Sequence, residues 1–451
     1  MCLIFAILSK FSDIWGMKGI IIENVLSEGC NRDILIEGRH IKSIVERDRY
    51  EKSAEEARKS RLLQKAKATG EYRIVDGRGK AVIPGFVNMH THSAMTLMRG
   101  CNEDAPLKEW LDSIWRIEPR LDEELIYWGT KLACLEMIKT GTTTFNDQYW
   151  MIESAVKASV EMGIRSYNSF VFLDMNDESR DEALKEECCR LYEASGKWGE
   201  LAHFAIAVHA PYSNSESCQL WASEFAKKKD LLLHIHISET ENELDESLQK
   251  YNMSPVERLE KMGVLSPNVL AAHCVWISGG DIEILGRNRV KVVHNINSNL
   301  KLASGYKFKY KELKEAGATV CIGTDGCASS NNLDMLEAMK TSALLQKAWR
   351  RDPKAMPLND LLDSATINGA QSLRLNSGKI EEGRLADILI IDVDNYAFTP
   401  NYNFIGNLIY SANSSCIEDV ICNGEFVMEN RVVKGEREIL DNVNRLYKKL
   451  L

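Results

Sequence analysis

Two histidines separated by one residue end an apolar segment near residue 90. His90 and His92 stand in VIPGFVNMHTH. Side chains two positions apart on a strand point to the same face, so both imidazoles can converge on one metal ion. An isolated His-x-His pair is weak evidence, but its place directly after IPGF, at the end of a predicted strand, favours a metal site.

Two later segments offer ligands of the same kind. His236 lies three residues before Glu239, a spacing that lets the histidine bind metal while the carboxylate leans over a substrate. Asp325, in IGTDG, adds an anionic ligand that can accept a proton from bound water. Three neutral histidines and one carboxylate suit Zn²⁺ and leave room for a water, whose pKa the ion lowers to about 7. The nucleophile would then be hydroxide. The expected ligands of this single divalent ion, with Zn²⁺ favoured, are His90, His92, His236 and Asp325.

From Val82 onward, strand-like apolar segments alternate with amphipathic helical segments such as 122–139 and 332–348. This alternation predicts a parallel sheet with helices outside it. The eight candidate strands are 82–92, 142–147, 164–172, 204–210, 231–238, 269–275, 290–297 and 319–326. Eight such strands can close into a (β/α)8 TIM-type barrel, an α/β fold whose active sites lie at the C-terminal ends of the strands.

Polar side chains gather at these strand ends. Histidines that merely fill a core would not fall so regularly near the ends of apolar runs, so we expect one rim of the barrel to carry the chemistry. The residues concerned are His90, His92, Asp147, His209, His236, His273, His294 and Asp325.

Two further histidines, His273 and His234, have more than one interpretation. His273 can bind a second metal ion or hydrogen-bond the hydroxide. In barrels with two metal ions a carboxylated lysine at the fourth strand bridges them, whereas this strand ends in VHAPYS, with His209 and no lysine, which favours one ion. His234 shares the face of His236 one layer deeper. An interior hydrogen-bonded histidine explains it as well as a catalytic role does, so it is left out of the metal set.

A serine or cysteine nucleophile is disfavoured. The chain has no GxSxG motif, which would hold a serine on a strained turn beside a base. Cys274 and Cys327 lie beside motif residues, but packing is the commoner role of a buried thiol.

Strand-like segments also occupy both ends of the chain. Residues 17–83 and 379–433 predict a small β-sandwich domain built from both ends, with the barrel, 84–378, inserted between them. Residues 48–70 are charged, rich in helix formers and closed by a glycine, so we expect a solvated helical insertion without chemistry. A helical segment, 434–451, ends the chain.

The 451-residue chain has a formal net charge of −9 with both signs interspersed. This balance argues against nucleic-acid binding and favours a small-molecule partner. Twelve scattered cysteines without a CxxC pair are typical of reduced thiols in a cytoplasmic protein. Residues 1–16 lack a cationic start and a cleavage site and are too short to span a bilayer. We interpret them as an extension dispensable for folding and activity, and expect no membrane association.

Five ordered motifs together resemble the amidohydrolase superfamily: VIPGFVNMHTHSAMTLMRG, HISETENE, AAHCVWI, HNINSNLKLASG and IGTDGCASSNN. The likeness runs from Met17 to about Val433. It is closest to 5′-methylthioadenosine/S-adenosylhomocysteine deaminases, a group that includes archaeal 5′-deoxyadenosine deaminases. The resemblance implies hydrolytic deamination of an adenosine-type nucleoside to the inosine analogue and ammonia. Relatives of this kind are commonly homo-oligomers, so the resemblance implies a homo-oligomer here as well.

The resemblance assigns catalytic roles to three residues. Glu239 would protonate the purine ring nitrogen beside the carbon under attack, and His273 would steady the hydroxide. Asp325 would take the water proton and return it to the departing ammonia, as general acid and base chemistry at neutral pH requires. The same four metal ligands are implied.

The resemblance also implies substrate contacts. Glu118, in RIEPRL, matches a residue that accepts hydrogen bonds from the ribose 2′- and 3′-hydroxyls. Without the resemblance, Glu118 would be interpreted as a solvated carboxylate in a loop. Arg180 stands in a charged stretch where a surface position is equally reasonable. The full set of implied substrate-binding residues is Glu118, Arg180, His209, Glu239 and Asp325.

Two departures from the family pattern stand out. The usual arginine at the end of the third strand is replaced by an aromatic residue around Phe170, which would suit a methylthio or methyl 5′ substituent better than the homocysteine zwitterion. HNIN replaces the more usual HNP.

Two other functions compete with this one. A sibling hydrolase, such as a chlorotriazine hydrolase or guanine deaminase, would share the metal ligands, but only a ribose-bearing ligand needs Glu118. A non-catalytic amidohydrolase-like scaffold is disfavoured because every metal ligand and Glu239 is present. Histidine and carboxylate ligands also suit iron, manganese or nickel, so the identity of the ion stays open.

Overall fold

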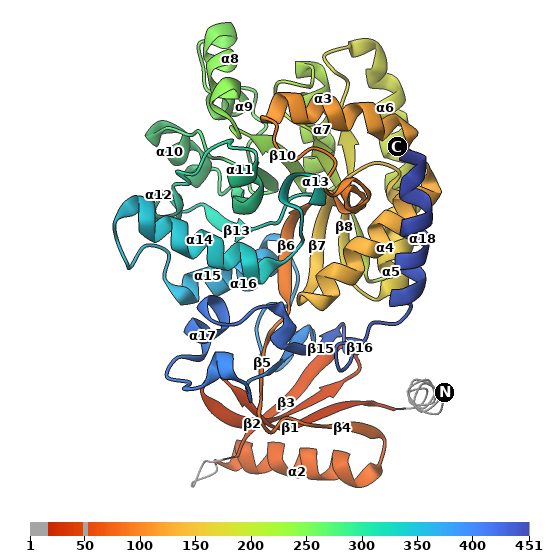
Figure 1. Ribbon diagram of the computed structural model, residues 1–451, viewed down its shortest axis with the longest axis vertical. Helices are drawn as coiled ribbons and strands as arrows, with labels where there is room; N and C mark the ends of the chain where they lie inside the picture. The colour runs from red at the N-terminus through yellow and green to blue at the C-terminus, as the bar shows by residue number, and fades with distance from the viewer. Residues whose placement is uncertain (1–16, 48–52, 451) are drawn as a thin grey trace.

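The strands of the computed structural model, which describes residues 17–47 and 53–450, form two sheets, one above the other in Figure 1. The upper sheet is a parallel eight-stranded barrel surrounded by helices, and the lower sheet is built from both ends of the chain. The predicted fold class is therefore confirmed. The extension predicted for residues 1–16 lies outside the described residues.

The barrel strands follow one another in chain order, each hydrogen-bonded in parallel to the next. In β10, Ile235 and Ile237 belong to the core beneath the helices, while His234 and His236 alternate to the other face. The strands are β6 (Phe86–Thr91), β7 (Thr142–Gln148), β8 (Arg165–Phe172), β9 (Ala202–Val208), β10 (Leu233–Ile237), β11 (Val269–His273), β12 (Lys291–His294) and β13 (Thr319–Ile322).

Hydrogen bonds close the barrel between its last strand, β13, and its first, β6. The backbone N–H of Asp325, just past β13, donates to the carbonyl of His90 at 3.0 Å. The Asn88 side chain donates to Thr324 Oγ1 at 2.7 Å and accepts from Thr324 N at 3.1 Å. The ends of the eighth and first strands are thereby fastened together.

Helices cover the outside of the barrel, and one, α3 (Leu107–Ile117), crosses near the C-terminal ends of the strands (Figure 1). The two helices predicted at 122–139 and 332–348 correspond to α4 and α14. The helices that follow the barrel strands along the chain are α4 (Glu123–Lys139), α5 (Ile152–Met162), α6 (Asp181–Ser195), α7 (Glu216–Lys228), α8 (Glu241–Tyr251), α9 (Pro255–Lys261), α10 (Gly279–Arg287), α11 (Ile296–Lys301), α12 (Tyr310–Glu315), α13 (Cys327–Ser330), α14 (Met335–Arg350), α15 (Leu358–Ala365) and α16 (Ile367–Ser372).

The lower sheet joins the two ends of the chain through antiparallel pairing of β5 with β14. Its order is β16-β15-β14-β5-β1-β2-β3, with β4 beside β1. Apolar residues from both ends, such as Ile22 and Ile390, share one buried cluster. The strands are β1 (Gly19–Ser27), β2 (Cys30–Glu37), β3 (His40–Glu46), β4 (Tyr72–Asp76), β5 (Lys80–Pro84), β14 (Ile388–Asp392), β15 (Ile417–Cys422) and β16 (Glu425–Met428).

The predicted first barrel strand, 82–92, is in fact two strands that belong to different sheets. β5 ends at Pro84 in the lower sheet and β6 begins at Phe86 in the barrel. Between them, a Cβ on Gly85 would lie only 2.2 Å from the Thr143 side chain, so the chain changes sheets where only glycine fits. One continuous apolar run concealed this break.

The charged segment predicted as a solvated insertion at 48–70 forms helix α2 (Ala54–Thr69), while residues 48–52 lie outside the described part. The helix is not wholly solvated. Its Leu63 and Ala66 are buried against the lower sheet, in a cluster with Ile21 and Leu35. Two apolar positions in an otherwise charged sequence were too few to predict this buried face.

The chain ends on helix α18 (Glu436–Leu446), which lies beside α4 (Figure 1) and buries Ile439 and Leu446 there. The helix before it in the chain, α17 (Phe404–Tyr410), comes ahead of β15 and β16.

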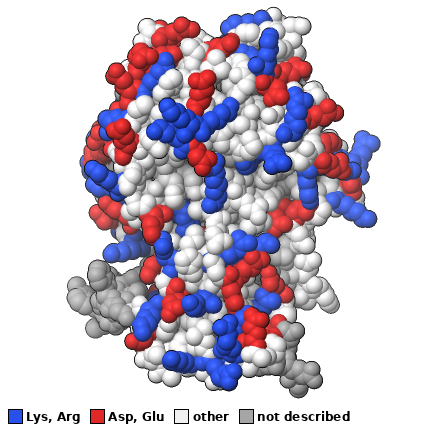
Figure 2. All heavy atoms as spheres, turned by 180° about the vertical axis from the view of Figure 1, so that it is seen from behind, with Lys and Arg blue, Asp and Glu red and all other residues white. Residues whose placement is uncertain are grey.

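No helix within residues 17–47 and 53–450 is long and apolar enough to cross a membrane. Acidic and basic side chains are interspersed over the face seen in Figure 2.

A buried ion pair joins the barrel to the lower sheet. Arg165 Nη1, at the start of β8, lies 2.5 Å from Asp387 Oδ2, and the two side chains are 2% and 0% exposed. Asp387 also accepts from Ser377 Oγ at 2.7 Å and from Asn423 N at 2.8 Å. These donors compensate the buried carboxylate for its lost hydration.

We predict that Asp387→Ala lowers the free energy of unfolding by about 3–5 kcal/mol, because it leaves the Arg165 guanidinium buried without its counter-charge. Urea or thermal unfolding followed by circular dichroism measures the change. Asp441→Ala, which removes an exposed ion pair with Arg437 on α18, is the control and should leave the midpoint nearly unchanged. Equal midpoints for both variants would contradict the proposed joint.

Candidate active site

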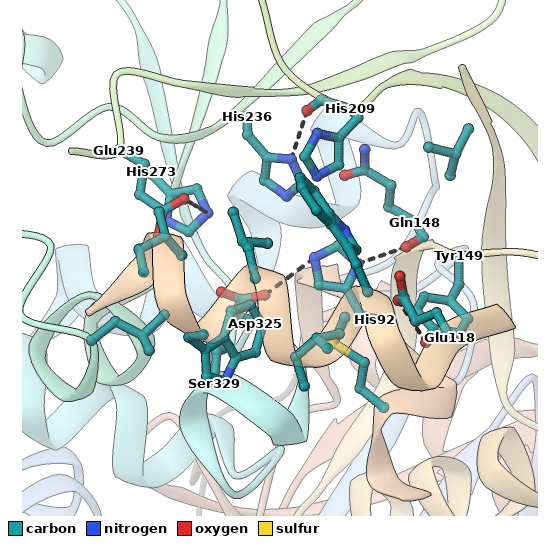
Figure 3. Close-up of a pocket in the computed structure, with 18 of the residues that line it drawn as sticks. His92, Glu118, Gln148, Tyr149, His209, His236, Glu239, His273, Asp325 and Ser329 are labelled. Atoms are coloured by element: carbon teal, nitrogen blue, oxygen red, sulfur yellow. Dashed lines mark hydrogen bonds and ion pairs between the residues drawn. The ribbon is translucent and has the colours of Figure 1, made fainter. Parts of the chain in front are cut away.

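A cavity lies at the C-terminal ends of the barrel strands, where the sequence predicted the chemistry (Figure 3). Helix α3 supplies one apolar wall through Leu107, Trp110, Leu111, Ile114 and Trp115. The polar lining residues are His92, Glu118, Gln148, Tyr149, His209, Tyr212, His236, Glu239, His273, Asp325 and Ser329.

The predicted metal ligands come together around His90. His90 Nε2 and His92 Nε2 each lie 3.3 Å from Asp325 Oδ1. One ligand atom from each of His90, His92 and Asp325 lies within 4.8 Å of the others, and the same holds for His90, His236 and His273. Asp325 reaches this cluster because the barrel closes at its own backbone N–H.

Each of the three predicted histidine ligands has its Nδ1 beside a protein partner. His92 Nδ1 lies 2.6 Å from the Gln148 carbonyl oxygen and His236 Nδ1 lies 2.6 Å from that of His209. His90 Nδ1 lies 2.8 Å from another imidazole, while its Nε2 is buried without a hydrogen-bond partner. Partners of this kind orient metal ligands in proteins, and the lone pair of the buried His90 Nε2, beside the Asp325 carboxylate, can bind a metal ion, so the site fits one.

The partner of His90 is His234, the histidine left open by the sequence. Its Nε2 faces His90, and its Nδ1 lies 2.9 Å from Asn146 Nδ2, which also donates to the Met89 carbonyl at 3.1 Å. His234 is fully buried. It is therefore an interior hydrogen-bonded histidine, and one that contacts a predicted ligand.

Burial keeps three of the histidines around the cavity neutral. It lowers the pKa of His90 and of His273 to about 4, and that of His209 to about 3. Burial alone would raise the pKa of Asp325, but the neighbouring histidines, His90 first, hold it well below its usual value. Neutral imidazole and ionised carboxylate are the forms that bind metals.

Glu239 faces the cluster from the turn after β10. Its Oε2 lies 3.7 Å from His273 Nε2, and Ser304 Oγ donates to its Oε1 at 3.4 Å. Burial, followed by the charge of Asp325, raises the pKa of Glu239 to about 8. The carboxyl can therefore hold a proton at neutral pH. His273 is itself held by Asn299 Nδ2, 2.9 Å from its Nδ1.

Glu118 lies on the side of the cavity opposite Glu239 (Figure 3). It follows α3 directly and accepts a hydrogen bond from Tyr149 Oη at 3.0 Å. Burial raises the pKa of its carboxyl. Only the resemblance pointed to Glu118, because its neighbours in sequence are those of an ordinary helix end.

Of two other residues predicted to contact the substrate, one lines the cavity and the other does not. His209 lines the cavity, with its Nδ1 2.8 Å from Ser213 Oγ. Arg180 does not: it ends a short 3-10 turn, Glu178–Arg180, as an exposed residue outside the cavity lining. Asp174 anchors this loop to Ser215 N and Oγ, which holds it against the start of α7. The structure therefore does not support Arg180 as a substrate contact.

Phe170 does not line the cavity that holds the histidine cluster. It packs on Phe172 and lines a neighbouring cavity, whereas Val171 lines both. Side chains alternate along β8, and the motif alone does not say which of two adjacent residues faces inward. The apolar character inferred for this wall nevertheless holds for Val171.

Sequence reasoning missed the aromatic wall and the support of the ligands. α3 reads LKEWLDSIWRI, with apolar residues at helical spacing, so an amphipathic helix could have been predicted there. Gln148 ends β7 and Tyr149 follows it, where only Asp147 had been noted. Asp147 instead accepts hydrogen bonds from Ser93 N and Thr91 Oγ1. His294 stacks on Phe308 and does not line the cavity.

The barrel, its lower sheet and the histidine–aspartate cluster define a member of the amidohydrolases. The model of the amidohydrolase family matches residues 81–427, and the chain belongs to this family, which is metal-dependent. The predicted family is thus confirmed.

Particular relatives narrow the comparison. The chain is 43% identical over 373 residues to the 5′-deoxyadenosine deaminase of Methanoregula boonei, covering 81% of this chain and 84% of that one. It is 41% identical over 382 residues to 5-methylthioadenosine/S-adenosylhomocysteine deaminase 1 of Archaeoglobus fulgidus, covering 84% and 90%. A solved adenosine deaminase from Xanthomonas campestris with bound zinc superposes with a TM-score of 0.86 at 28% identity, covering 96% of this chain and 98% of that one.

We predict that His234→Gln weakens divalent-metal binding about 10- to 100-fold, because His90 loses the partner that orients it. Metal content per chain, measured after dialysis against graded chelator concentrations, reports the affinity. His203→Gln, at the start of β9 and remote from the cluster, is the matched control and should bind metal as the wild type does. An unchanged metal affinity in His234→Gln would show that the contact between His234 and His90 does not support metal binding.

Proposed function

We propose that this chain hydrolyses the exocyclic amino group of an adenosine-type nucleoside, releasing ammonia and leaving the inosine analogue. One observation carries the proposal. A single cavity holds the histidine–aspartate cluster and Glu239 at one side and the Glu118 carboxylate at the other, so a purine and its ribose have separate polar partners (Figure 3). The names of the curated relatives, 5′-deoxyadenosine deaminase and 5-methylthioadenosine/S-adenosylhomocysteine deaminase, support it.

The donor set suits one divalent ion, for which we propose Zn²⁺. His90, His92, His236 and Asp325 would hold it, and the bound zinc of the Xanthomonas campestris structure supports this choice. When bound, such an ion polarises water and makes a nucleophile available at neutral pH.

The remaining steps belong to side chains of this chain. Glu239, protonated at neutral pH, donates its carboxyl proton to the ring nitrogen beside the attacked carbon and makes that carbon more electrophilic. Asp325 accepts one proton from the attacking water through its carboxylate and passes it to the exocyclic amino group, which leaves as ammonia. The second proton, on the oxygen now bonded to the ring carbon, returns to Glu239. His273, 3.7 Å from Glu239, hydrogen-bonds the attacking oxygen.

The rest of the cavity suits a nucleoside. Glu118, held by the Tyr149 hydroxyl, accepts hydrogen bonds from the ribose 2′- and 3′-hydroxyls. The aromatic and aliphatic wall of α3 excludes water and packs on the purine. His209, just after β9, contacts the substrate as well. Candidate substrates are 5′-deoxyadenosine, 5′-methylthioadenosine, S-adenosylhomocysteine and adenosine.

We also propose a cytoplasmic location and a homo-oligomeric assembly. All eleven described cysteines are free thiols, which supports the cytoplasm as the compartment. A homo-oligomer, carried over from the family resemblance, is proposed as the assembly.

Ammonia release from a substrate panel tests the function. The metal-loaded protein should deaminate 5′-deoxyadenosine, 5′-methylthioadenosine, S-adenosylhomocysteine or adenosine with a kcat/KM in the range of ordinary enzymes, about 10⁴ M⁻¹s⁻¹ or above. Guanine and a chlorotriazine are included as competing substrates. Turnover of guanine or the triazine, without turnover of any nucleoside, would overturn the proposal in favour of a sibling hydrolase.

We predict that Glu118→Gln lowers kcat/KM for nucleosides about 10- to 100-fold, because the amide offers one acceptor where the carboxylate offers two. Steady-state kinetics with adenosine and with free adenine separate this from a general defect, since only the nucleoside carries ribose. Glu109→Gln, which alters an exposed glutamate on α3, the helix just before Glu118, is the control. Unchanged nucleoside kinetics in Glu118→Gln would remove the main argument for a ribose-bearing substrate.

A further inference from the structure

Glu239 is carried by a short turn between β10 and α8 whose backbone is unusual. Ser238, directly before it, has φ of +51°, in the left-handed region that non-glycine residues rarely adopt. Such a conformation persists only where surrounding bonds enforce it. On one side, the Ser238 carbonyl accepts from Val275 N at 3.0 Å and from Trp276 N at 2.9 Å, which ties the turn to the segment after β11.

The other side of the turn is held by one carboxylate, that of Glu243. Its Oε1 accepts from the backbone N–H of Ser238 and its Oε2 from that of Glu239, both at 2.9 Å. Glu243 is the third residue of α8, and its own N–H donates to the helix cap, Thr240 Oγ1, at 3.2 Å. An ordinary capping box would return the side chain to the cap residue, whereas here it reaches one and two residues further back.

The placement of this carboxylate is not that of a surface charge. Glu243 is 6% exposed, although its neighbours in α8 are mostly exposed, including Glu241 and Glu246. Burying a carboxylate is unfavourable unless donors replace its hydration. Both of its oxygens are engaged by backbone of the turn that presents Glu239, so any shift of Glu243 moves the backbone of Glu239 directly.

We propose that Glu243 is a positioning residue for the deamination, acting through Glu239. This inference rests on the proposed function. By clamping the two successive N–H groups, Glu243 fixes the backbone from which the Glu239 carboxyl reaches Ser304 and His273. Loss of the clamp would let the turn relax, and the Glu239 carboxyl would leave the position from which it protonates the purine ring. Placement errors of about 1 Å are known to reduce rates about 100-fold.

Glu243→Gln tests the clamp, because glutamine has a single acceptor oxygen and its amide nitrogen cannot accept from the second N–H. We expect at least a 10-fold lower kcat for nucleoside deamination, a KM within about threefold of the wild type and an unchanged metal content. Glu246→Gln, on the exposed side of the same helix, is the matched control and should retain wild-type kinetics.

A double-mutant cycle with Glu239→Gln separates positioning from a general structural role. If Glu243 acts only through Glu239, the double variant should be no more than about twofold slower than Glu239→Gln alone. A purely structural role would multiply the two losses, and this result would overturn the proposal. A kcat of Glu243→Gln within twofold of the wild type would overturn it as well.

Glu243→Asp keeps the test decisive if the glutamine variant does not fold. The aspartate retains the charge but is one methylene too short to reach both donors, so it should show the same pattern with a smaller loss. The outcomes are distinct from failure of the proposed function. If the wild type releases no ammonia from any nucleoside, the function is wrong, whereas if only the Glu239 variant is slow, the clamp alone is wrong.

Discussion

One backbone hydrogen bond, from Asp325 N to the carbonyl of His90, is the constraint on which the site depends. It joins the last strand of the barrel to the first and therefore brings together residues 235 positions apart in sequence. The anionic ligand and the first histidine meet because the sheet closes, and the remaining histidines meet them because each ends a strand of the same barrel. Without closure, these side chains would lie along the edge of an open sheet.

Burial acts in opposite directions on the two kinds of group in this cavity. It removes the proton from the imidazoles of His90 and His273, and it keeps a proton on Glu239. The same desolvation thus prepares basic ligands for a cation and an acid for a ring nitrogen. Asp325 escapes the trend, because the surrounding histidines stabilise its charge.

Most of the barrel could be predicted from the sequence, because eight apolar runs alternate with helical segments and seven of these runs end at or beside a polar residue. The predicted ligands lie close together for this reason. What could not be predicted depends on geometry that periodicity does not encode: the change of sheet at Gly85, and the choice between Phe170 and Val171 as the residue that faces the cavity. Glu118 could be predicted only from the family resemblance. Arg180 aligns with a substrate-binding residue of the family but lies outside the cavity lining, so alignment alone did not place it correctly.

Because β5 pairs with β14, one edge of β5 stays unpaired during much of the chain's synthesis. As the ribosome releases the protein from its N-terminus, β5 emerges about 300 residues before its partner strand. Throughout that time the edge of β5 that pairs with β14 has no native neighbour, and exposed strand edges invite pairing with other chains. Pairing with β14 covers this edge and thereby removes a site at which newly made chains could aggregate.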